Sequence, residues 1–149
     1  MKISVAMAYY NGGMYIEEQM DTILTQLGAQ DEVIVSIDGA SDGSKPLLLK
    51  MVEEDKRIHV IKGPGKGVVK NFENAIRHCS GEIIYLSDQD DIWKPDKVKK
   101  VNEAFLNPKV KAVLHDAQIV DECGNPTGAE GLFANRGSRK GILKNLIKN

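Results

Sequence analysis

Gly81-Glu82-Ile83-Ile84-Tyr85-Leu86 runs directly into Ser87-Asp88-Gln89-Asp90-Asp91, so an apolar segment ends in three carboxylates within four positions. Such a pattern is typical of a buried parallel strand that delivers polar side chains to the carboxyl edge of a sheet. Open α/β folds place their ligands at that edge. The stretch therefore predicts both the fold class and the location of a functional site.

The acidic turn after this strand favours a metal-assisted phosphate or diphosphate site. Carboxylate oxygens this close together suit Mg²⁺ or Mn²⁺, which usually share their coordination sphere with substrate phosphates. Two alternatives stay open. The aspartates can serve only as turn formers or as a cap for the helix that Pro95 and Asp96 open. A structural Ca²⁺ loop is disfavoured because the spaced ligands of an EF-hand are missing.

Length and charge narrow the possible functions. At 149 residues the chain is expected to form a single domain, and 20 basic against 21 acidic side chains give no electrostatic case for nucleic acid binding. Cys79 and Cys123 lie far apart without zinc-site spacing, which indicates a reduced, cytoplasmic setting. The first apolar run is too short for a signal peptide and no 18-residue apolar stretch exists, so only a peripheral membrane role stays open.

Strand and helix patterns alternate along most of the chain. Apolar spacing, Gly and Pro positions and acidic first turns predict strands at 3–8, 31–37, 57–62, 81–86 and 110–115, and helices at 14–27, 46–54, 68–78 and 95–106. A short added strand or hairpin is expected at 118–126 and an amphipathic helix at 140–149. Alternating βα units predict an α/β fold with a mostly parallel central sheet, right-handed crossovers and helices on both faces.

Two further loops are candidates for ligand contact. Asp38 directly follows the second predicted strand and shares its sheet edge with the acidic turn, although Asp-Gly is also a common turn pair. Gly63-Pro64-Gly65-Lys66-Gly67 superficially resembles a phosphate loop. It lacks both the Ser or Thr after lysine and the four-residue spacer of a Walker A motif, so we reject that interpretation.

Four stretches together resemble the family 2 glycosyltransferases, and most closely the rhamnosyltransferase-like group. They occur in the family's order and cover residues 1 to about 95: Ile3 to Gly12, Val35 to Asp42, Gly67 to Phe72 and Ser87 to Trp93. The resemblance implies a GT-A fold, with a Rossmann-like nucleotide-binding sheet and Asp88-Gln89-Asp90 at the family's DxD motif. It also implies a nucleotide-sugar donor, a polysaccharide or lipid-linked saccharide acceptor, and Mn²⁺ or Mg²⁺ as cofactor.

The resemblance also implies roles for individual residues. Asp90 would ligate the metal, and Asp88 would approach the ribose, the metal or a metal-bound water. Asp38 would hydrogen-bond the base, and Lys70 would lie near the nucleotide. The remaining nucleotide-sugar contacts would come from Ala8, Tyr9, Tyr10, Asn11 and Gln89.

This sequence departs from the family pattern in two ways. Ile37 replaces the first aspartate of the usual pair, and Tyr9 stands where a small hydroxyl residue is common, so base recognition could differ. Relatives are also longer, and the region carrying their catalytic base has no counterpart here. Residues 1–149 are thus expected to form one donor-binding domain, truncated before the acceptor region, with Asp116 beside His115 as the weak candidate for the base.

Two functions follow from these expectations. The first is a metal-dependent, inverting glycosyltransferase. The second is a nucleotide-sugar-binding module without turnover, because the acceptor half is missing.

Overall fold

The computed structural model describes residues 1–121, 124–128 and 131. Its chain divides into two compact units, Met1–Glu103 and Ala104–Asn149, which we describe separately. The regular elements are β1 (Ile3–Tyr10), α1 (Ile16–Leu24), β2 (Glu32–Gly39), α2 (Lys45–Glu54), β3 (Ile58–Lys62), α3 (Val68–His78), β4 (Ile83–Ser87) and α4 (Lys97–Phe105).

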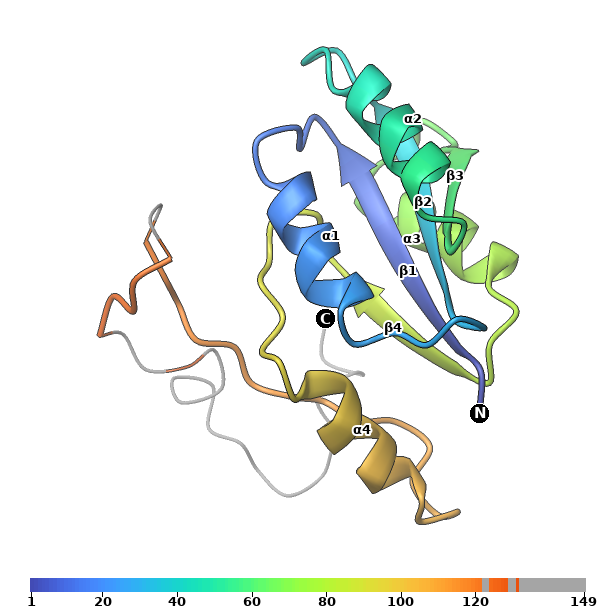
Figure 1. The fold of residues 1–149 in the computed structure, drawn as a ribbon, viewed down its shortest axis with the longest axis vertical. Helices are drawn as coiled ribbons and strands as arrows, with labels where there is room; N and C mark the ends of the chain where they lie inside the picture. Colours follow the sequence, from blue (N-terminus) through green and yellow to red (C-terminus); the bar gives the residue numbers. More distant parts are fainter. Residues whose placement is uncertain (122–123, 129–130, 132–149) are drawn as a thin grey trace. The chain divides into compact units, whose positions relative to one another are not determined.

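A four-stranded parallel sheet in the order β3-β2-β1-β4 forms the centre of the first unit. The chain moves outward from β1 to β3 and then returns across β1 to β4. Right-handed crossovers therefore put α1 and α2 on one face and α3 on the other, as Figure 1 shows. The predicted α/β class, with helices on both faces of a parallel sheet, is confirmed.

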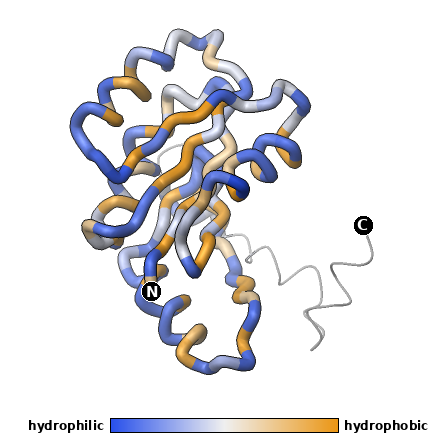
Figure 2. Tube along the Cα trace, turned by 90° about the vertical axis from the view of Figure 1, so that its right-hand side faces the viewer, coloured by the Kyte–Doolittle hydropathy of each residue, from blue (hydrophilic) through white to orange (hydrophobic). Residues whose placement is uncertain are grey.

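The core lies against the central strand β1, whose apolar side chains are inaccessible on both faces of the sheet. Val5, Ala6 and Met7 have no exposed surface. α1 buries Ile16, Met20 and Ile23 on its sheet side, and its remaining positions are polar except for the half-buried Leu24. Figure 2 shows the same division, with hydrophobic strands inside and hydrophilic positions recurring along the helices.

The predicted fifth strand at 110–115 is wrong. Residues 110–119 have no regular structure, and Leu114 is 57% exposed. An apolar run becomes a strand only where another strand satisfies its backbone, and no described segment pairs with this one. The hairpin expected at 118–126 is reduced to one antiparallel bridge, Val120 to Pro126. The predicted helix at 140–149 lies outside the described residues.

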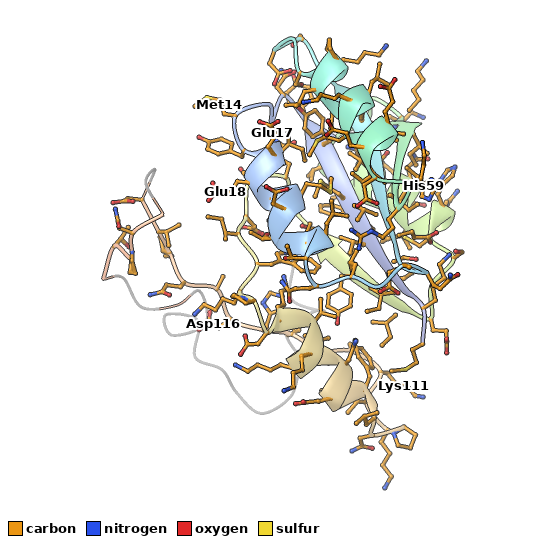
Figure 3. The ribbon with its side chains drawn as sticks, in the orientation of Figure 1. Met14, Glu17, Glu18, His59, Lys111 and Asp116 are labelled. Carbon is orange, nitrogen blue, oxygen red and sulfur yellow. The ribbon has the colours of Figure 1, made fainter. Side chains whose placement is uncertain are left out.

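Smaller differences concern the first helix. α1 starts at Ile16 rather than at position 14, and Met14 is 88% exposed in the loop before it (Figure 3). Across the described residues, no helix combines the length and the apolar character needed to cross a bilayer.

Candidate functional site

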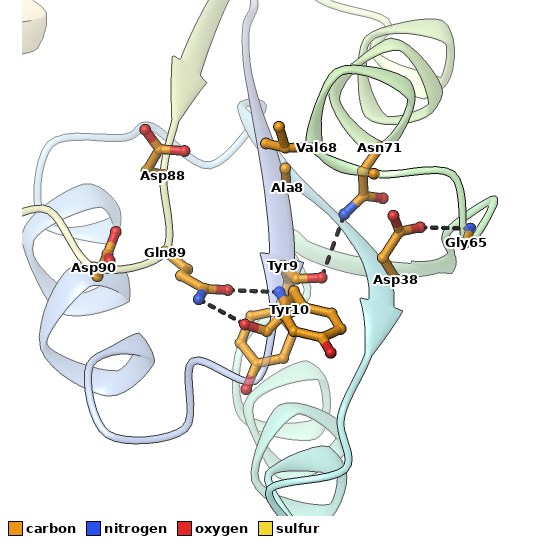
Figure 4. Close-up of a pocket in the computed structure, with 11 residues that line it drawn as sticks. Ala8, Tyr9, Tyr10, Asp38, Gly65, Val68, Asn71, Asp88, Gln89 and Asp90 are labelled. Atoms are coloured by element: carbon orange, nitrogen blue, oxygen red, sulfur yellow. Dashed lines mark hydrogen bonds between the residues drawn. The ribbon is translucent and has the colours of Figure 1, made fainter.

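A cleft of about 660 Å³ opens at the carboxyl ends of β1, β2 and β4 (Figure 4). Because these strands are parallel, their last residues and the loops that follow meet at one edge of the sheet. The cleft is lined by Ala8, Tyr9, Tyr10, Asp38, Gly65, Gly67, Val68, Asn71, Asp88, Gln89 and Asp90. Six of the eight nucleotide-sugar candidates, and both metal candidates, are in this set.

The end of β1 contributes mainly backbone to the cleft. The side chain of Tyr9 is fully buried and its hydroxyl donates a hydrogen bond to Ser44 at the start of α2. Burial is the main reason why the pKa of Tyr9 is raised, so the phenol stays neutral. Tyr10 is 62% exposed and is the aromatic side chain that the cleft offers to a ligand.

Asn11 does not line the cleft but shapes the loop beside it. Its φ of 49° is left-handed, a conformation that asparagine tolerates better than most residues. Its Oδ1 accepts a hydrogen bond from the Ser41 amide at 2.8 Å. The Asp42 carboxylate accepts another from the Gly13 amide at 2.9 Å, so the loops after β1 and β2 are joined.

The acidic turn is held to the end of β1 by its central glutamine. Gln89 Oε1 accepts from the Tyr10 amide at 2.7 Å, and Gln89 Nε2 donates to the Tyr10 carbonyl at 2.8 Å. The pair continues the β1–β4 hydrogen bonding beyond the last paired residues, Met7 and Ser87. Gln89 therefore fixes where the flanking aspartates emerge.

The two flanking carboxylates have no counter-charge among the residues that the structure describes. Neither the Asp88 nor the Asp90 side chain makes a hydrogen bond or ion pair to any residue that the structure describes. Partial loss of hydration raises the pKa of Asp88, and the neighbouring carboxylates of Asp91 and Asp90 raise it further. An arriving cation would relieve this repulsion.

This donor set fits Mg²⁺ or Mn²⁺ shared with a phosphate better than an ion enclosed by protein. Within residues 1–121, 124–128 and 131, no three His, Cys, Asp or Glu side chains converge closely enough to hold a metal ion. One or two carboxylates completed by substrate phosphates and water is the usual environment of Mg²⁺.

Opposite the acidic turn, Asp38 and Asn71 form the other wall of the cleft. Asp38 Oδ1 accepts from the Gly65 amide at 2.8 Å. Asn71 is 2% exposed, and its Nδ2 donates to the Ser36 carbonyl at 2.8 Å and to the Tyr9 carbonyl at 3.3 Å. Asn71 thus joins α3 to both β1 and β2, while its Oδ1 is buried without a hydrogen-bond partner among described residues.

Lys70 does not line the cleft. Its ammonium pairs with Glu73 at 2.6 Å on α3, and its side chain is 57% exposed. The neighbouring Asn71 lines the cleft instead, and the rejected glycine loop supplies Gly65 and Gly67. Sequence reasoning gave none of these three residues a binding role, although Gly67 and Asn71 lie in one of the four family-like stretches.

The weak candidate for a catalytic base belongs to the other compact unit. Asp116 lies in Ala104–Asn149, and its Oδ1 accepts a hydrogen bond from the Ala117 amide at 2.9 Å. The segment before it is not a strand, so the reason for expecting Asp116 at the sheet's carboxyl edge is lost.

The sequence model described as "Glycosyl transferase family 2" matches residues 4–146, which is nearly the whole chain. The chain belongs to glycosyl transferase family 2. Among curated family members, the chain is 33% identical over 127 residues to TuaG of Bacillus subtilis, named as a teichuronic acid biosynthesis glycosyltransferase. That match covers 83% of this chain and 50% of TuaG.

Two solved glycosyltransferases share the architecture. A Pyrobaculum calidifontis mannosyltransferase, solved with GDP-Man and Mn²⁺, has a TM-score of 0.67 at 24% identity over 72% of this chain and 33% of its own. S. aureus TarS 1-349, solved with UDP-GlcNAc, has a TM-score of 0.59 at 25% identity over 72% and 32%. These similarities establish a GT-A fold, and the chain spans half or less of each relative's length.

Proposed function

We propose that this chain is the donor-binding part of a metal-dependent, inverting glycosyltransferase. It would take a sugar from a nucleotide-sugar donor and deliver it to a polysaccharide or lipid-linked saccharide acceptor. TarS is described in complex with UDP-GlcNAc, which supports a nucleotide-sugar donor, and TuaG is named for teichuronic acid synthesis, which supports a polysaccharide acceptor. The rhamnosyltransferase-like subgroup remains our prediction from the sequence motifs.

The observation that carries the proposal is the state of the acidic turn. Its backbone is fixed by Gln89, whereas the carboxylates of Asp88 and Asp90 line the cleft without a counter-charge from the described part of the chain. When bound, Mn²⁺ or Mg²⁺ would stabilise the charge that develops on the departing diphosphate. Asp90 would hold the ion, and Asp88 would hold the ion or the ribose.

The other wall of the cleft would bind the nucleoside. Asp38 presents an acceptor-only carboxylate, which favours a base that offers a hydrogen-bond donor. Tyr10 presents an exposed ring on which a base can stack. The backbone around Ala8 would line the ribose.

A binding module without turnover is the second candidate. Apart from the three aspartates already given donor-side roles, no carboxylate or histidine is among the residues that line the cleft. An acceptor hydroxyl needs a general base within about 3 Å. The acceptor side of the reaction would then require protein beyond this cleft.

The test is calorimetric titration of the chain with UDP, GDP and dTDP sugars, in Mn²⁺ and in EDTA. We expect Mn²⁺ to increase the affinity for one nucleotide class. Asp90→Ala should lower the affinity measured in Mn²⁺ at least about 10-fold, because even residues that only orient metal ligands change metal affinity by about 10- to 100-fold. Asp91→Ala is the matched control, because it removes the same charge from the same turn but does not line the cleft.

Equal losses of affinity in the two variants would mean that nucleotide binding depends on the total negative charge of the turn and not on Asp90 in particular. If the nucleotide-sugar affinity of the parent chain is the same in Mn²⁺ and in EDTA, the metal assignment is wrong.

A further inference from the structure

Gln19 is a fully buried polar residue on α1, beneath the strand that ends in the acidic turn. It has no exposed surface, whereas its neighbours Glu17 and Glu18 are exposed on the same helix (Figure 3). Its side-chain Nε2 donates to Ser87 Oγ at 2.7 Å and to the Asp88 carbonyl at 3.0 Å. A side chain from residue 19 therefore binds the backbone of the first acidic residue.

The orientation of this amide is determined by its partners. The Asp88 carbonyl can only accept a hydrogen bond, so the amide nitrogen of Gln19 must face it. The Thr22 hydroxyl lies 2.9 Å from the Gln19 main-chain carbonyl and 3.2 Å from Gln19 Oε1, so its single proton is shared between them. The two hydrogen bonds donated by the amide nitrogen are what define the position of this buried side chain.

The acidic turn is thus held from two sides. Gln89 ties it to the end of β1, and Gln19 ties the preceding Ser87 and Asp88 to α1. Neither contact uses a carboxylate oxygen. Both hydrogen-bonding glutamines consequently fix the backbone while leaving the Asp88 and Asp90 carboxylates available to a cation.

We infer that Gln19 is a positioning residue for the metal-binding carboxylates, an inference that rests on the proposed function. Groups that orient metal ligands typically affect metal affinity by about 10- to 100-fold. Gln19 acts on the Asp88 main chain, so its effect falls on the geometry of the turn and not on its charge.

The matched comparison is Gln19→Met against Gln26→Met. Gln26 is the control because its Oε1 accepts from the Val98 amide at 3.1 Å, in α4 and not in the acidic turn. Methionine retains the length and most of the volume of glutamine but cannot donate a hydrogen bond. Each variant therefore loses a hydrogen-bonded side-chain amide, buried in Gln19 and part-buried in Gln26, and only Gln19→Met loses a contact to Asp88.

Two measurements are made on the 149-residue chain. The first is the ratio of nucleotide-sugar affinities in Mn²⁺ and in EDTA. We expect Gln19→Met to lower this ratio at least about 10-fold, with metal-free affinity changed less than about two-fold, and Gln26→Met to leave the ratio unchanged. If Gln19 had a purely structural role, Gln19→Met would lower the melting temperature and would change the affinities in Mn²⁺ and in EDTA by the same factor.

The second measurement is the backbone ¹⁵N order parameter of residues 88–90 without ligand. We expect a fall from about 0.85 to below about 0.6 in Gln19→Met and no fall in Gln26→Met. An ordered turn in Gln19→Met, or an unchanged Mn²⁺ ratio, would overturn the inference. If the parent itself lacks a Mn²⁺ effect, the metal part of the proposed function fails, and the order parameters still decide whether Gln19 holds the turn.

Ser87→Ala keeps the test decisive if Gln19→Met does not fold. It retains the glutamine but removes Ser87 Oγ, one of the two acceptors of Gln19 Nε2, by deleting a single oxygen atom. We expect a smaller loss in the same direction for both measurements. Unchanged values in this variant would contradict the inference.

Discussion

Replacing Glu32 with glutamine is expected to destabilise the fold while leaving nucleotide affinity unchanged. Glu32 lies at the start of β2, at the sheet edge opposite the cleft, and is 8% exposed. Its carboxylate accepts from Ser4 Oγ at 2.6 Å and from the Ser80 amide at 2.6 Å, and pairs with Lys2 Nζ at 3.0 Å. These contacts join the starts of β1 and β2 to the loop before β4.

The magnitude follows from the pKa of Glu32. Burial alone would raise this pKa, but the hydrogen bonds from Ser4, Ser80 and Lys2 outweigh burial and lower it to about 2. An unfolded glutamate titrates near 4.3, and each pKa unit corresponds to about 1.36 kcal/mol, so the ionised group contributes about 3 kcal/mol at neutral pH. Because the folded pKa is the lower one, this stability is present above about pH 4.3 and is lost as the pH falls towards 2.

Urea denaturation of the parent and Glu32→Gln at pH 7, 6, 4 and 3 measures this contribution. The parent should be more stable at pH 7, and the difference should narrow by about 1.7 kcal/mol between pH 6 and pH 3. Glu82→Gln is the control, because its side chain is 69% exposed at the same sheet edge, and it should cost less than about 0.5 kcal/mol. A difference that stays constant with pH would refute the assignment of the low pKa to Glu32.

Three further predictions concern the cleft. The raised pKa of Asp88 predicts that, on acidification, Mn²⁺-dependent nucleotide affinity falls at a higher pH than an unperturbed aspartate would give, since a protonated carboxyl no longer attracts a cation. Asp88→Asn should weaken binding less than Asp90→Ala and should flatten that pH profile in calorimetry. Asp38→Asn should change the preference among UDP, GDP and dTDP more than it changes Mn²⁺ affinity, and equal weakening of all nucleotides would make Asp38 purely structural. The 149-residue chain should bind a donor but transfer little sugar, and robust transfer with a loss in Asp116→Asn would instead make Asp116 the base.

Most of the first unit could be predicted because its signals are local. The apolar run at 83–87 and the acidic turn after it occupy neighbouring positions in the sequence, and strand-helix alternation determines on which edge the turn emerges. Asp38 was found for the same reason, since it ends β2. Both predictions needed only periodicity and the direction of the strands.

The contacts that hold the site could not be predicted in this way. Gln19 and Asp88 are 69 positions apart, and Asn71 and Tyr9 are 62 apart. A glutamine on an amphipathic helix normally faces water, and only the packing of α1 under β4 makes Gln19 buried. The predicted strand at 110–115 was wrong for a related reason. Its sequence has the strand pattern, but no described segment pairs with it.

The two edges of the sheet differ in whether their carboxylates have hydrogen-bond and ion-pair partners. At the edge where the strands begin, the buried Glu32 has an ammonium and several donors around it, so its charge stabilises the fold. At the edge where the strands end, Asp88 and Asp90 have no such partners within residues 1–121, 124–128 and 131, and their carboxylates repel one another. Uncompensated charge costs stability, and a protein keeps it where a ligand removes the cost. The same four strands therefore carry a carboxylate that stabilises the fold at one edge. At the other edge they carry a turn whose backbone is held by glutamine side chains while its carboxylates stay available to a cation.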